Sequence, residues 1–329
     1  MKIYKMLIII CLVVIFSSNL ELEAASNKTT YTYHPNKKVE TRTVRNSKGI
    51  KLDYKRYTNK GKKIVDYDYC SGNNQVYKIT TYTTAGKVKT VKRYKCKQSN
   101  LNVAQFNVLK PDDMTYGKWT SRLKRISGTI SKAKADVVSL NEVYEGYQKT
   151  GIQNNTSYKI IQPKGKEPYG WTSAIAYNSK KVKLINSGAY FFKNQETYTS
   201  GSLKGKQASR TAVWAIFEKE GVRFIFISGQ TQNDWYTNVR YKQIKEMQAL
   251  GTRLSNKYGI KNVVYAGDFN ADGYKNKNCT SPLPTYVGSK RKLSYDYICS
   301  SNGTNTRGAI IDSKASDHTL VYTSTTIKR

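Results

Sequence analysis

Short apolar runs alternate with helical patterns after about residue 100, and several of these runs end in polar side chains. Residues 103–109 and 136–140 have the composition of buried strands, and the apolar positions of 119–130 recur at helical spacing. A second helical stretch covers about 239–257. Further strand-like runs lie at 174–177, 212–217, 224–228, 263–266 and 295–299. This alternation predicts an α/β domain whose polar strand ends gather along one edge of a sheet sandwich.

Two short motifs concentrate the side chains that carry chemistry, GDFNAD at 267–272 and SDH at 316–318. Asp268 can take a proton from water, Asn270 can hold that water or a phosphate oxygen, and His318 can stabilise charge that develops on phosphorus. These groups favour metal-assisted phosphodiester hydrolysis. Asp and Asn at strand ends also cap turns, and Asp272 and Asp312 are interpreted as loop residues of that kind.

The first residues of the chain have the pattern of a secretory signal peptide. Lys2 and Lys5 precede the apolar run 6–16, and small residues follow near position 25. A membrane anchor would need roughly 20 apolar residues, whereas Ser and Asn interrupt this run at 17–19. We therefore expect residues 1–25 to be removed and the protein to be secreted.

Cysteine usage agrees with an oxidising compartment. Cys11 leaves with the signal peptide, and Cys70, Cys96, Cys279 and Cys299 remain as an even set. Three pairings are possible in principle, and Cys70 with Cys96 and Cys279 with Cys299 keeps each disulfide inside one expected domain. Neither pair has the spacing of zinc ligands, which disfavours a structural zinc site.

The formal net charge of +34, with a sequence pI of about 9.8, predicts a polyanionic partner. Nucleic acid fits best, because each phosphate that the protein neutralises releases counterions and adds salt-sensitive affinity. Anionic membranes, cell-wall polymers and heparin-like sugars would attract the same charge. No stable protein partner is implied.

Residues 26–99 are rich in Lys, Tyr and Thr and nearly lack long aliphatic side chains. Runs such as 51–57 and 78–82 alternate with strand period, and turn signals stand between such runs at 47–49, 59–61 and 84–86. The pattern predicts a small, mainly β module of hairpins closed by a Cys70–Cys96 bridge. Its tyrosines and lysines would either stack on bases and hold phosphates, or pack a module that attaches to cell wall or matrix.

Six motifs in order resemble the endonuclease/exonuclease/phosphatase family over about residues 100–327, and within it the secreted deoxyribonuclease I group. They are QFNVL at 105–109, LNEV at 140–143, SRTAVWAIF at 209–217, GDFNAD at 267–272, YDYI at 295–298 and SDH at 316–318. The resemblance implies a four-layer α/β sandwich over 100–329, two mixed sheets faced by helices with the site at one edge, preceded by the small β module. Cys279 and Cys299 match positions of that family's disulfide.

The resemblance also implies a role for each matched polar residue. These roles are cation binding by Glu142 with Asn107 beside it, metal or water binding by Asp317, water activation by Asp268, orientation of water or phosphate by Asn270, control of the His318 tautomer by Asp296, and phosphate contact by Arg210. The expected cofactor is a divalent metal, Mg²⁺ first, with Mn²⁺ or Ca²⁺ as alternatives, since hard cations prefer oxygen ligands and neutralise phosphoryl charge.

One position departs from the family pattern. Where many relatives have a histidine after the strand that 224–229 resembles, this chain has Gln230, which cannot donate a proton as a general acid. The glutamate that pairs with that histidine is also missing, because Trp, Thr and Ser stand at 171–173. Three explanations remain: Gln230 holds the phosphate while metal-bound water protonates the leaving oxygen, the alignment is slipped towards Gln232, or the domain binds without efficient catalysis.

The sequence therefore predicts a secreted, metal-dependent nuclease with DNA as the favoured substrate. The β module would raise affinity for DNA or tether the enzyme. A sphingomyelinase-like or other phospholipid phosphodiesterase is the alternative enzyme, although the segments 194–207 and 276–292 are polar and basic rather than apolar. A catalytically weak adhesin that binds DNA or cell wall is the alternative outside the enzyme class.

Overall fold

The computed structural model describes residues 27–45, 49, 51–69, 75–94, 98–143, 146–162, 173–195, 197, 210–233, 237–280, 282–303 and 308–328. The expected signal peptide and the positions of Cys70 and Cys96 lie outside these ranges. None of the helices within them combines the length and apolar composition that a membrane span requires.

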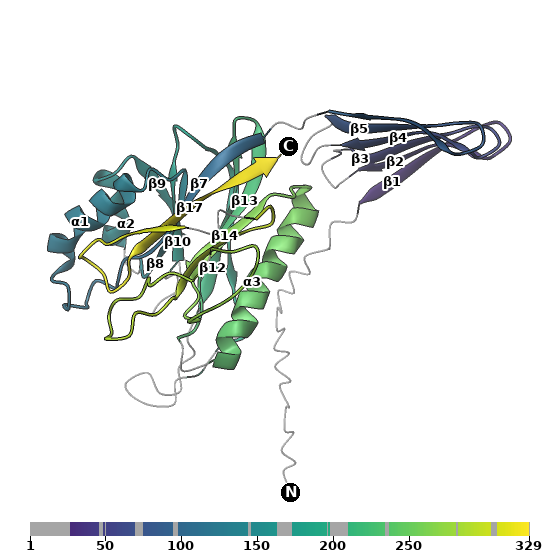
Figure 1. Ribbon diagram of the computed structural model, residues 1–329. Helices are drawn as coiled ribbons and strands as arrows, with labels where there is room; N and C mark the ends of the chain where they lie inside the picture. The colour runs from purple at the N-terminus through teal and green to yellow at the C-terminus, as the bar shows by residue number, and fades with distance from the viewer. Residues whose placement is uncertain are drawn as a thin grey trace, which may run out of the picture.

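Two mixed sheets pack face to face in the C-terminal part of the chain (Figure 1). The first sheet has the order β16-β17-β7-β8-β10-β9 and the second the order β11-β12-β13-β14-β15. The strands of the first are β7 Gln98–Asn107, β8 Val137–Asn141, β9 Tyr158–Ile161, β10 Ser173–Asn178, β16 Ala309–Ile311 and β17 Leu320–Lys328. Those of the second are β11 Lys183–Phe191, β12 Thr211–Lys219, β13 Val222–Gln230, β14 Val263–Asp268 and β15 Asp296–Ser300.

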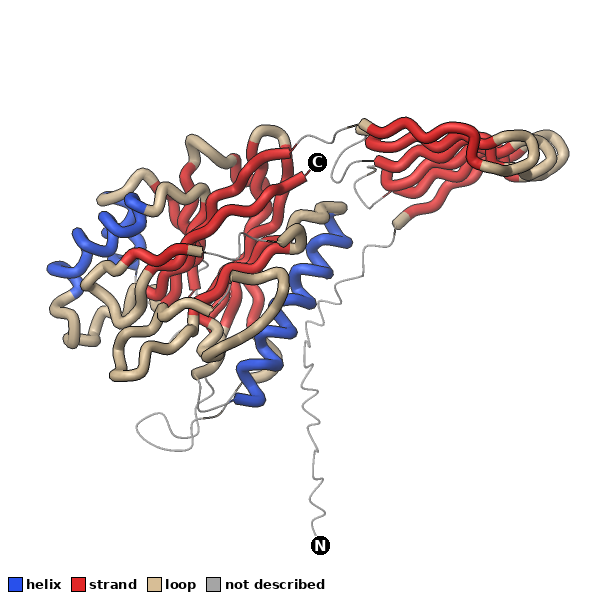
Figure 2. The backbone as a smooth tube through the Cα atoms, viewed as in Figure 1, coloured by secondary structure: helices blue, strands red, loops and turns tan. Residues whose placement is uncertain are grey.

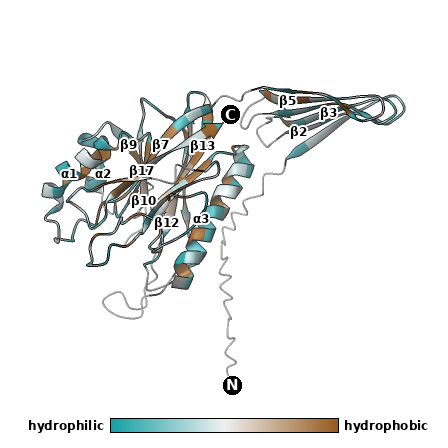
Figure 3. Cartoon of the chain, in the orientation of Figure 1, coloured by the Kyte–Doolittle hydropathy of each residue, from teal (hydrophilic) through white to brown (hydrophobic). Residues whose placement is uncertain are grey.

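Helices cover the outer face of each sheet, as the tube in Figure 2 shows. They are α1 Trp119–Lys132 and α2 Gly146–Asn154 on the first sheet and α3 Thr237–Tyr258 on the second. Ile126 of α1 and Met247 of α3 are fully buried against their sheets, and Phe226 is fully buried between the sheets. Hydrophobic and hydrophilic bands alternate along α3 (Figure 3). The expected four-layer α/β sandwich is confirmed.

Strand alternation carries polar side chains into the space between the two sheets. On β7, Leu101 and Val103 belong to the apolar cluster between the sheets, and Gln105 and Asn107 continue the same face. On β14, Val264 and Ala266 belong to the same apolar cluster, and Asp268 continues their face at the end of the strand. The space between the sheets is therefore apolar at one end and polar at the other, where the site residues lie.

Parallel pairing brings the carboxyl ends of neighbouring strands together. β7 runs parallel to β8 with Asn107 opposite Asn141, and β13 runs parallel to β14 with Gln230 opposite Asp268. Four motif residues thus reach the same edge of the sandwich from four strands. A disulfide between Cys279 and Cys299 joins β15 to the loop that follows β14, as expected.

The N-terminal residues form a separate six-stranded antiparallel sheet in simple chain order. Its strands are β1 Lys28–Tyr33, β2 Val39–Arg45, β3 Lys51–Tyr57, β4 Lys63–Tyr69, β5 Val76–Tyr82 and β6 Val88–Arg93. Within the described part of 27–94, Thr43 and Thr80 are the only buried side chains. This sheet is one layer thick, in contrast to the sandwich, whose first strand begins at Gln98.

The same turn recurs after every second strand of this sheet. At 34–38, 58–62 and 83–87, the first residue's N–H donates to the carbonyl of the fifth, and the fourth residue's N–H donates back to the carbonyl of the first. The fourth residue has positive φ in each turn, which Gly61 and Gly86 adopt without strain and Lys37 adopts at 63°. The turn signals at 59–61 and 84–86 in the sequence fall within two of these repeated turns.

Candidate active site

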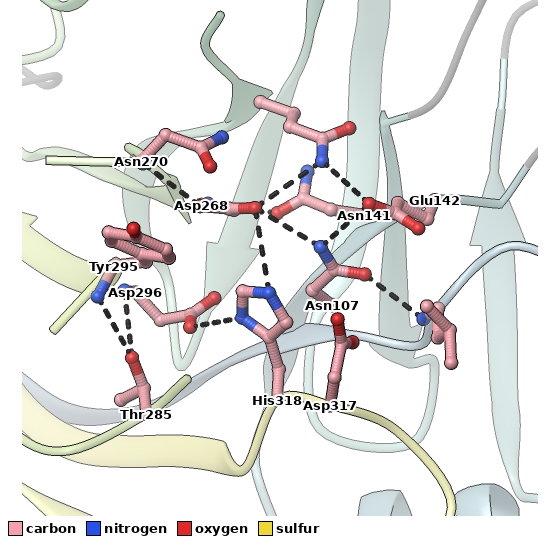
Figure 4. Close-up of polar contacts among 12 residues, drawn as sticks. Asn107, Asn141, Glu142, Asp268, Asn270, Thr285, Tyr295, Asp296, Asp317 and His318 are labelled. Atoms are coloured by element: carbon pink, nitrogen blue, oxygen red, sulfur yellow. Dashed lines mark hydrogen bonds and ion pairs between the residues drawn. The ribbon is translucent and has the colours of Figure 1, made fainter. Parts of the chain in front are cut away.

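Asp268 stands at the centre of the polar cluster and is 1% exposed (Figure 4). Its Oδ2 accepts hydrogen bonds from Asn107 Nδ2 at 3.1 Å and from Gln230 Nε2 at 3.3 Å. Its Oδ1 accepts the backbone N–H of Asn270 at 2.9 Å. Asn270 has a φ of 48° and donates its own Nδ2 to Thr231 O. The carboxylate is fixed from several sides.

His318 lies between two carboxylates, as Figure 4 shows. Its Nδ1 is 2.7 Å from Asp296 Oδ2, and its Nε2 is 4.0 Å from Asp268 Oδ2. The ring of Tyr286 packs edge-on against the imidazole, with centroids 5.1 Å apart. Asp296 therefore orients the ring so that Nε2 faces Asp268 at a distance too long for a hydrogen bond.

Burial and charge shift the pKa values of the central pair. Burial raises the pKa of Asp268, and the opposing charge of His318 only partly offsets it, which leaves that pKa at about 6. Burial alone would lower the pKa of His318, but Asp296, followed by Asp268 and Asp317, outweighs burial and raises it to about 10. At neutral pH the site holds an imidazolium beside an ionised carboxylate that is more basic than an exposed aspartate.

Glu142 follows β8 in a left-handed conformation with a φ of 61°, which a residue with a side chain rarely adopts. Its Oε1 accepts hydrogen bonds from Asn107 Nδ2 at 3.1 Å and Gln230 Nε2 at 3.2 Å, and its Oε2 accepts the Lys110 N–H at 2.8 Å. This arrangement turns the carboxylate towards Asp268 at the mouth of the site.

The acidic side chains fit a divalent cation. Glu142 and Asp317 are both partly exposed, and burial raises the pKa of Asp317, with repulsion from Glu142 adding to the shift against the opposing effect of His318. A hard cation bound through oxygen would relieve this repulsion. Asn107 offers less to a metal, because its Oδ1 accepts the Leu109 N–H at 3.0 Å and its Nδ2 faces the carboxylates.

A second acidic group, Asp53, Asp66 and Asp68, lies in the N-terminal sheet. Each carboxylate of this group pairs with a basic side chain: Asp53 with Arg42 and Lys55, Asp66 with Lys63, and Asp68 with Lys78. These ion pairs account for the clustering without a metal.

Gln230, and not Gln232, occupies the position beside Asp268. Its Nε2 bridges Asp268 and Glu142, while its Oε1 is buried and has no hydrogen-bond partner among the described residues. Gln232 Oε1 instead accepts the Nε of Arg210 at 3.1 Å. A slipped alignment therefore does not explain the missing histidine. Arg210 makes no hydrogen bond to the carboxylates among the described residues and lies beside the cluster.

Two buried residues that the sequence analysis did not single out hold the site residues in place through hydrogen bonds. Gln105 Nε2 donates to Asp296 Oδ1 at 3.0 Å and to Asn141 Oδ1 at 2.7 Å. Asn141 Oδ1 also accepts the backbone N–H of Asp268 at 3.0 Å. Both belong to the motifs QFNVL and LNEV. Two sequence signals pointed to them: Gln105 shares a strand face with Asn107, and Asn141 directly precedes Glu142.

The SDH segment is tied to the same edge through Ser316. Its Oγ donates to the Asn107 carbonyl at 2.8 Å and accepts the His318 N–H at 3.1 Å. The fully buried Arg122 donates to the carbonyls of Val108 and Ala315, which joins the loop after β7 to this segment. These contacts hold the C-terminal histidine against the first strand of the sandwich.

Comparison with known proteins agrees with this geometry. Residues 104–318 match the endonuclease/exonuclease/phosphatase family. No curated protein sequence matches significantly. Among solved structures, a functionally unknown conserved protein of Enterococcus faecalis is 19% identical, covers 70% of this chain and 100% of its own, and has a TM-score of 0.55. The mannosyl-6-phosphatase Bt3783 of Bacteroides thetaiotaomicron is 18% identical, with coverages of 69% and 99% and a TM-score of 0.52.

The catalytic domain of human Nocturnin, solved with a bound sulfate anion, is 16% identical, with coverages of 71% and 98% and a TM-score of 0.52. At such identities these structures show a shared fold. Proteins of this family hydrolyse phosphodiesters or phosphate esters and generally use divalent metals. With the family match spanning residues 104–318, which is most of the sandwich, this chain belongs to the endonuclease/exonuclease/phosphatase family.

Proposed function

We propose that this protein is an exported, metal-dependent nuclease that hydrolyses phosphodiester bonds of nucleic acid, with DNA as the favoured substrate. One observation carries the proposal: Asp268, whose pKa is raised to about 6, faces His318 held by Asp296. A basic carboxylate and a fixed imidazolium side by side suit attack of water on a phosphate diester.

A basic hairpin beside the site supports a polyanionic substrate. Tyr286 and Leu293 exchange backbone hydrogen bonds, and the segment between them carries the exposed residues 290–292, Lys-Arg-Lys. Tyr286 packs on His318, and the Val287 N–H donates to Asp317 O, so the hairpin is anchored to the site itself. Its charge suits a phosphate backbone and, together with the net charge of +34, favours nucleic acid over a lipid substrate.

In the proposed mechanism, Asp268 accepts a proton from the attacking water, which the Asn270 side chain helps to orient. The His318 imidazolium stabilises the negative charge that grows on the phosphoryl oxygens, and Asp296 holds its orientation and charge. A divalent cation bound by Glu142 and Asp317 would supply further neutralisation of phosphoryl charge. Gln105 and Asn141 keep Asp296 and Asp268 in place from below.

Gln230 contributes hydrogen bonds and no proton. Its Nε2 links Asp268 to Glu142, and its unpartnered Oε1 can accept a hydrogen bond from water. The leaving oxygen then takes its proton from solvent. The proposal shares with the first explanation a nuclease that works without the second histidine, but it gives Gln230 contacts to Asp268 and Glu142 instead of to the phosphate.

The test is conversion of supercoiled plasmid with Mg²⁺, Mn²⁺, Ca²⁺ or EDTA. We expect metal-dependent nicking by the wild type and its loss in Asp268→Ala and His318→Ala, whereas Asp312→Ala, which removes an exposed carboxylate paired with Lys314, should cleave normally. Equal nicking by the site variants and the wild type would refute the site. A gel shift without nicking would favour the DNA-binding adhesin and make sphingomyelin the next substrate to assay.

Export is part of the proposal and has its own measurement. The supporting observations are the signal-like residues 1–25 and the Cys279–Cys299 disulfide, a bond typical of oxidising compartments. Mass spectrometry of the protein from culture medium should show a mature chain that begins near residue 26. An intact N-terminus in a cytoplasmic fraction would contradict export.

A further inference from the structure

The N-terminal sheet has two faces with different electrostatic character. Cross-strand partners share a face, and so do every second residues along a strand. The register places Tyr54 opposite Tyr67 and, at the adjacent position, Asp53 opposite Asp68. We call the side that carries Tyr54 and Tyr67 the tyrosine face, and the side that carries Asp53 and Asp68 the paired face.

Most of the charge on the paired face is neutralised within it. Arg42 and Lys55 lie 2.6 and 3.3 Å from Asp53 Oδ2, and Lys78 lies 3.0 Å from Asp68 Oδ2. These basic side chains already have carboxylate partners, and the carboxylates would repel a polyanion. This face is a poor surface for phosphate.

The tyrosine face has the opposite character. Tyr54 and Tyr67 pack edge-on with ring centroids 5.6 Å apart, and Lys51 Nζ lies 5.7 Å from the Tyr54 centroid. Arg56 continues this face on β3 and Lys92 continues it on β6, because the register pairs Lys92 with Ile79 and Ile79 with Tyr67. Both Arg56 and Lys92 are exposed.

Carboxylates are nearly absent from this side. The register rows that run through Tyr54 and through Arg56 contain no Asp or Glu at any described position. The nearest is Glu40 at the hairpin bulge beside β1, where it accepts a hydrogen bond from Thr32. No described helix or strand covers either face of the sheet. The tyrosine face is an uncovered surface of aromatic rings framed by positive charge.

We propose that the tyrosine face binds a nucleic-acid strand, with Arg56 and Lys92 on phosphates and the Tyr54–Tyr67 pair against bases. The proposal rests on the proposed function for the choice of polymer. Charge complementarity selects this face over the paired one. Aromatic rings beside positive charge are the combination by which proteins hold single strands without sequence preference. A wall polymer or polyphosphate has no base to place on the rings.

The main test compares adjacent residues that point to opposite faces. Arg56→Gln/Lys92→Gln removes two charges from the tyrosine face, and Lys55→Gln/Arg93→Gln removes two from the paired face on the same strands. Binding of a fluorescent oligothymidylate to the full chain is measured by anisotropy in EDTA, so that no hydrolysis occurs. The first variant should bind about tenfold more weakly at 50 mM salt, with a salt slope reduced by about 1.4 for two phosphate contacts. The second should bind within about twofold of the wild type. Equal losses in both variants would overturn the proposal.

A second arm separates bases from phosphates. Tyr67→Leu keeps apolar bulk and should weaken oligothymidylate binding several-fold while leaving competition by inorganic polyphosphate unchanged. Equal effects on both ligands, or on neither, would mean that the face attracts polyanions without reading bases, which contradicts the proposal. Thermal unfolding of each variant checks that the sheet is intact. Hydrolysis of bis(p-nitrophenyl) phosphate with Mg²⁺ is assayed separately. Its absence in the wild type would contradict the proposed nuclease activity but would not affect the conclusion about binding.

Discussion

The N-terminal sheet and the sandwich are both β-rich but are stabilised in different ways. In the sandwich, apolar clusters lie between the sheets and beneath the helices, and most of their side chains are fully buried. In the sheet, almost all described side chains are partly or fully exposed, and stability comes from cross-strand pairs, ion pairs and the repeated turn. The sheet can present a whole face to a ligand, whereas the sandwich can enclose one.

That difference explains where each region places its charge. A buried carboxylate such as Asp268 and a left-handed Glu142 are unfavourable by themselves, and a large core supplies the stability that holds them in place. In the thin sheet every described charged residue is at least partly exposed, and solvent screens its charge. This contrast agrees with our proposals that the sandwich carries out the chemistry and that the sheet captures the substrate.

The largest expected contrast is in stability. Phe226→Ala removes a fully buried ring from between the sheets and should lower the free energy of unfolding by about 3–5 kcal/mol. Ile79→Ala, the matched truncation on the tyrosine face, should lower it by about 1 kcal/mol or less, since its side chain is only partly buried. Urea unfolding of the full chain measures both. Similar losses would show that the sheet has a core of its own.

The disulfide is a second source of stability that the described part of the N-terminal sheet does not share. It stabilises the sandwich mainly by restricting the unfolded chain. Cys279 and Cys299 are 20 residues apart, and a loop of about this length predicts a loss of about 3 kcal/mol for Cys279→Ser/Cys299→Ser. The loss should fall on the unfolding transition of the sandwich, with reduced wild type as the control. A variant as stable as the oxidised wild type would contradict this.

The parts of the sandwich that could be predicted from the sequence were the strands that read as continuous apolar runs. Residues 224–228 and 263–266 became the buried centres of β13 and β14. β11 was missed because none of its residues is fully buried and its sequence includes Asn, Ser and Gly. α2 was missed because its apolar periodicity is weak and Gln148 fills a buried position where an apolar residue would be expected.

The site divides in the same way. Asp268 and His318 were predicted from the chemistry of their motifs and Asp296 from the family resemblance, and the structure brings the three together. The link from Gln105 to Asp296 joins residues from distant parts of the chain, and only the packing of one sheet on the other creates it. The position of Arg210 beside Gln232 likewise depends on how two strands end, which no local pattern specifies.

A charge placed at Gln230 tests how far the sandwich tolerates buried like charges. Gln230→Glu keeps the shape and replaces the donor between Asp268 and Glu142 by a third carboxylate. We expect kcat/KM to fall at least tenfold in plasmid nicking. Gln232→Glu is the matched control, because its new charge would face the Arg210 guanidinium, and it should retain most activity. Full activity of Gln230→Glu would show that this bridge is dispensable.

The smallest predicted effect is a shift in pH dependence. Asp268 must be ionised to act as a base, so kcat/KM should rise as pH passes about 6, where burial has placed its pKa. His318 must stay protonated, so activity should fall as pH approaches about 10. Burial opposes the charge on His318 and Asp296 sustains it, so Asp296→Asn should move the alkaline limb to lower pH by about one unit or more. Hydrolysis of bis(p-nitrophenyl) phosphate between pH 5 and pH 10 measures both limbs. An unmoved alkaline limb would remove His318 from the proposed role.

The repeated turn of the N-terminal sheet gives this region an evolutionary freedom that the sandwich lacks. Each turn closes through hydrogen bonds within its own five residues, and each strand pairs only with its sequence neighbours. Gain or loss of one two-strand unit would preserve the alternation of faces and leave the sandwich untouched. The length of the ligand surface can therefore change by duplication or deletion of whole hairpins, while the catalytic part of the same gene stays constant.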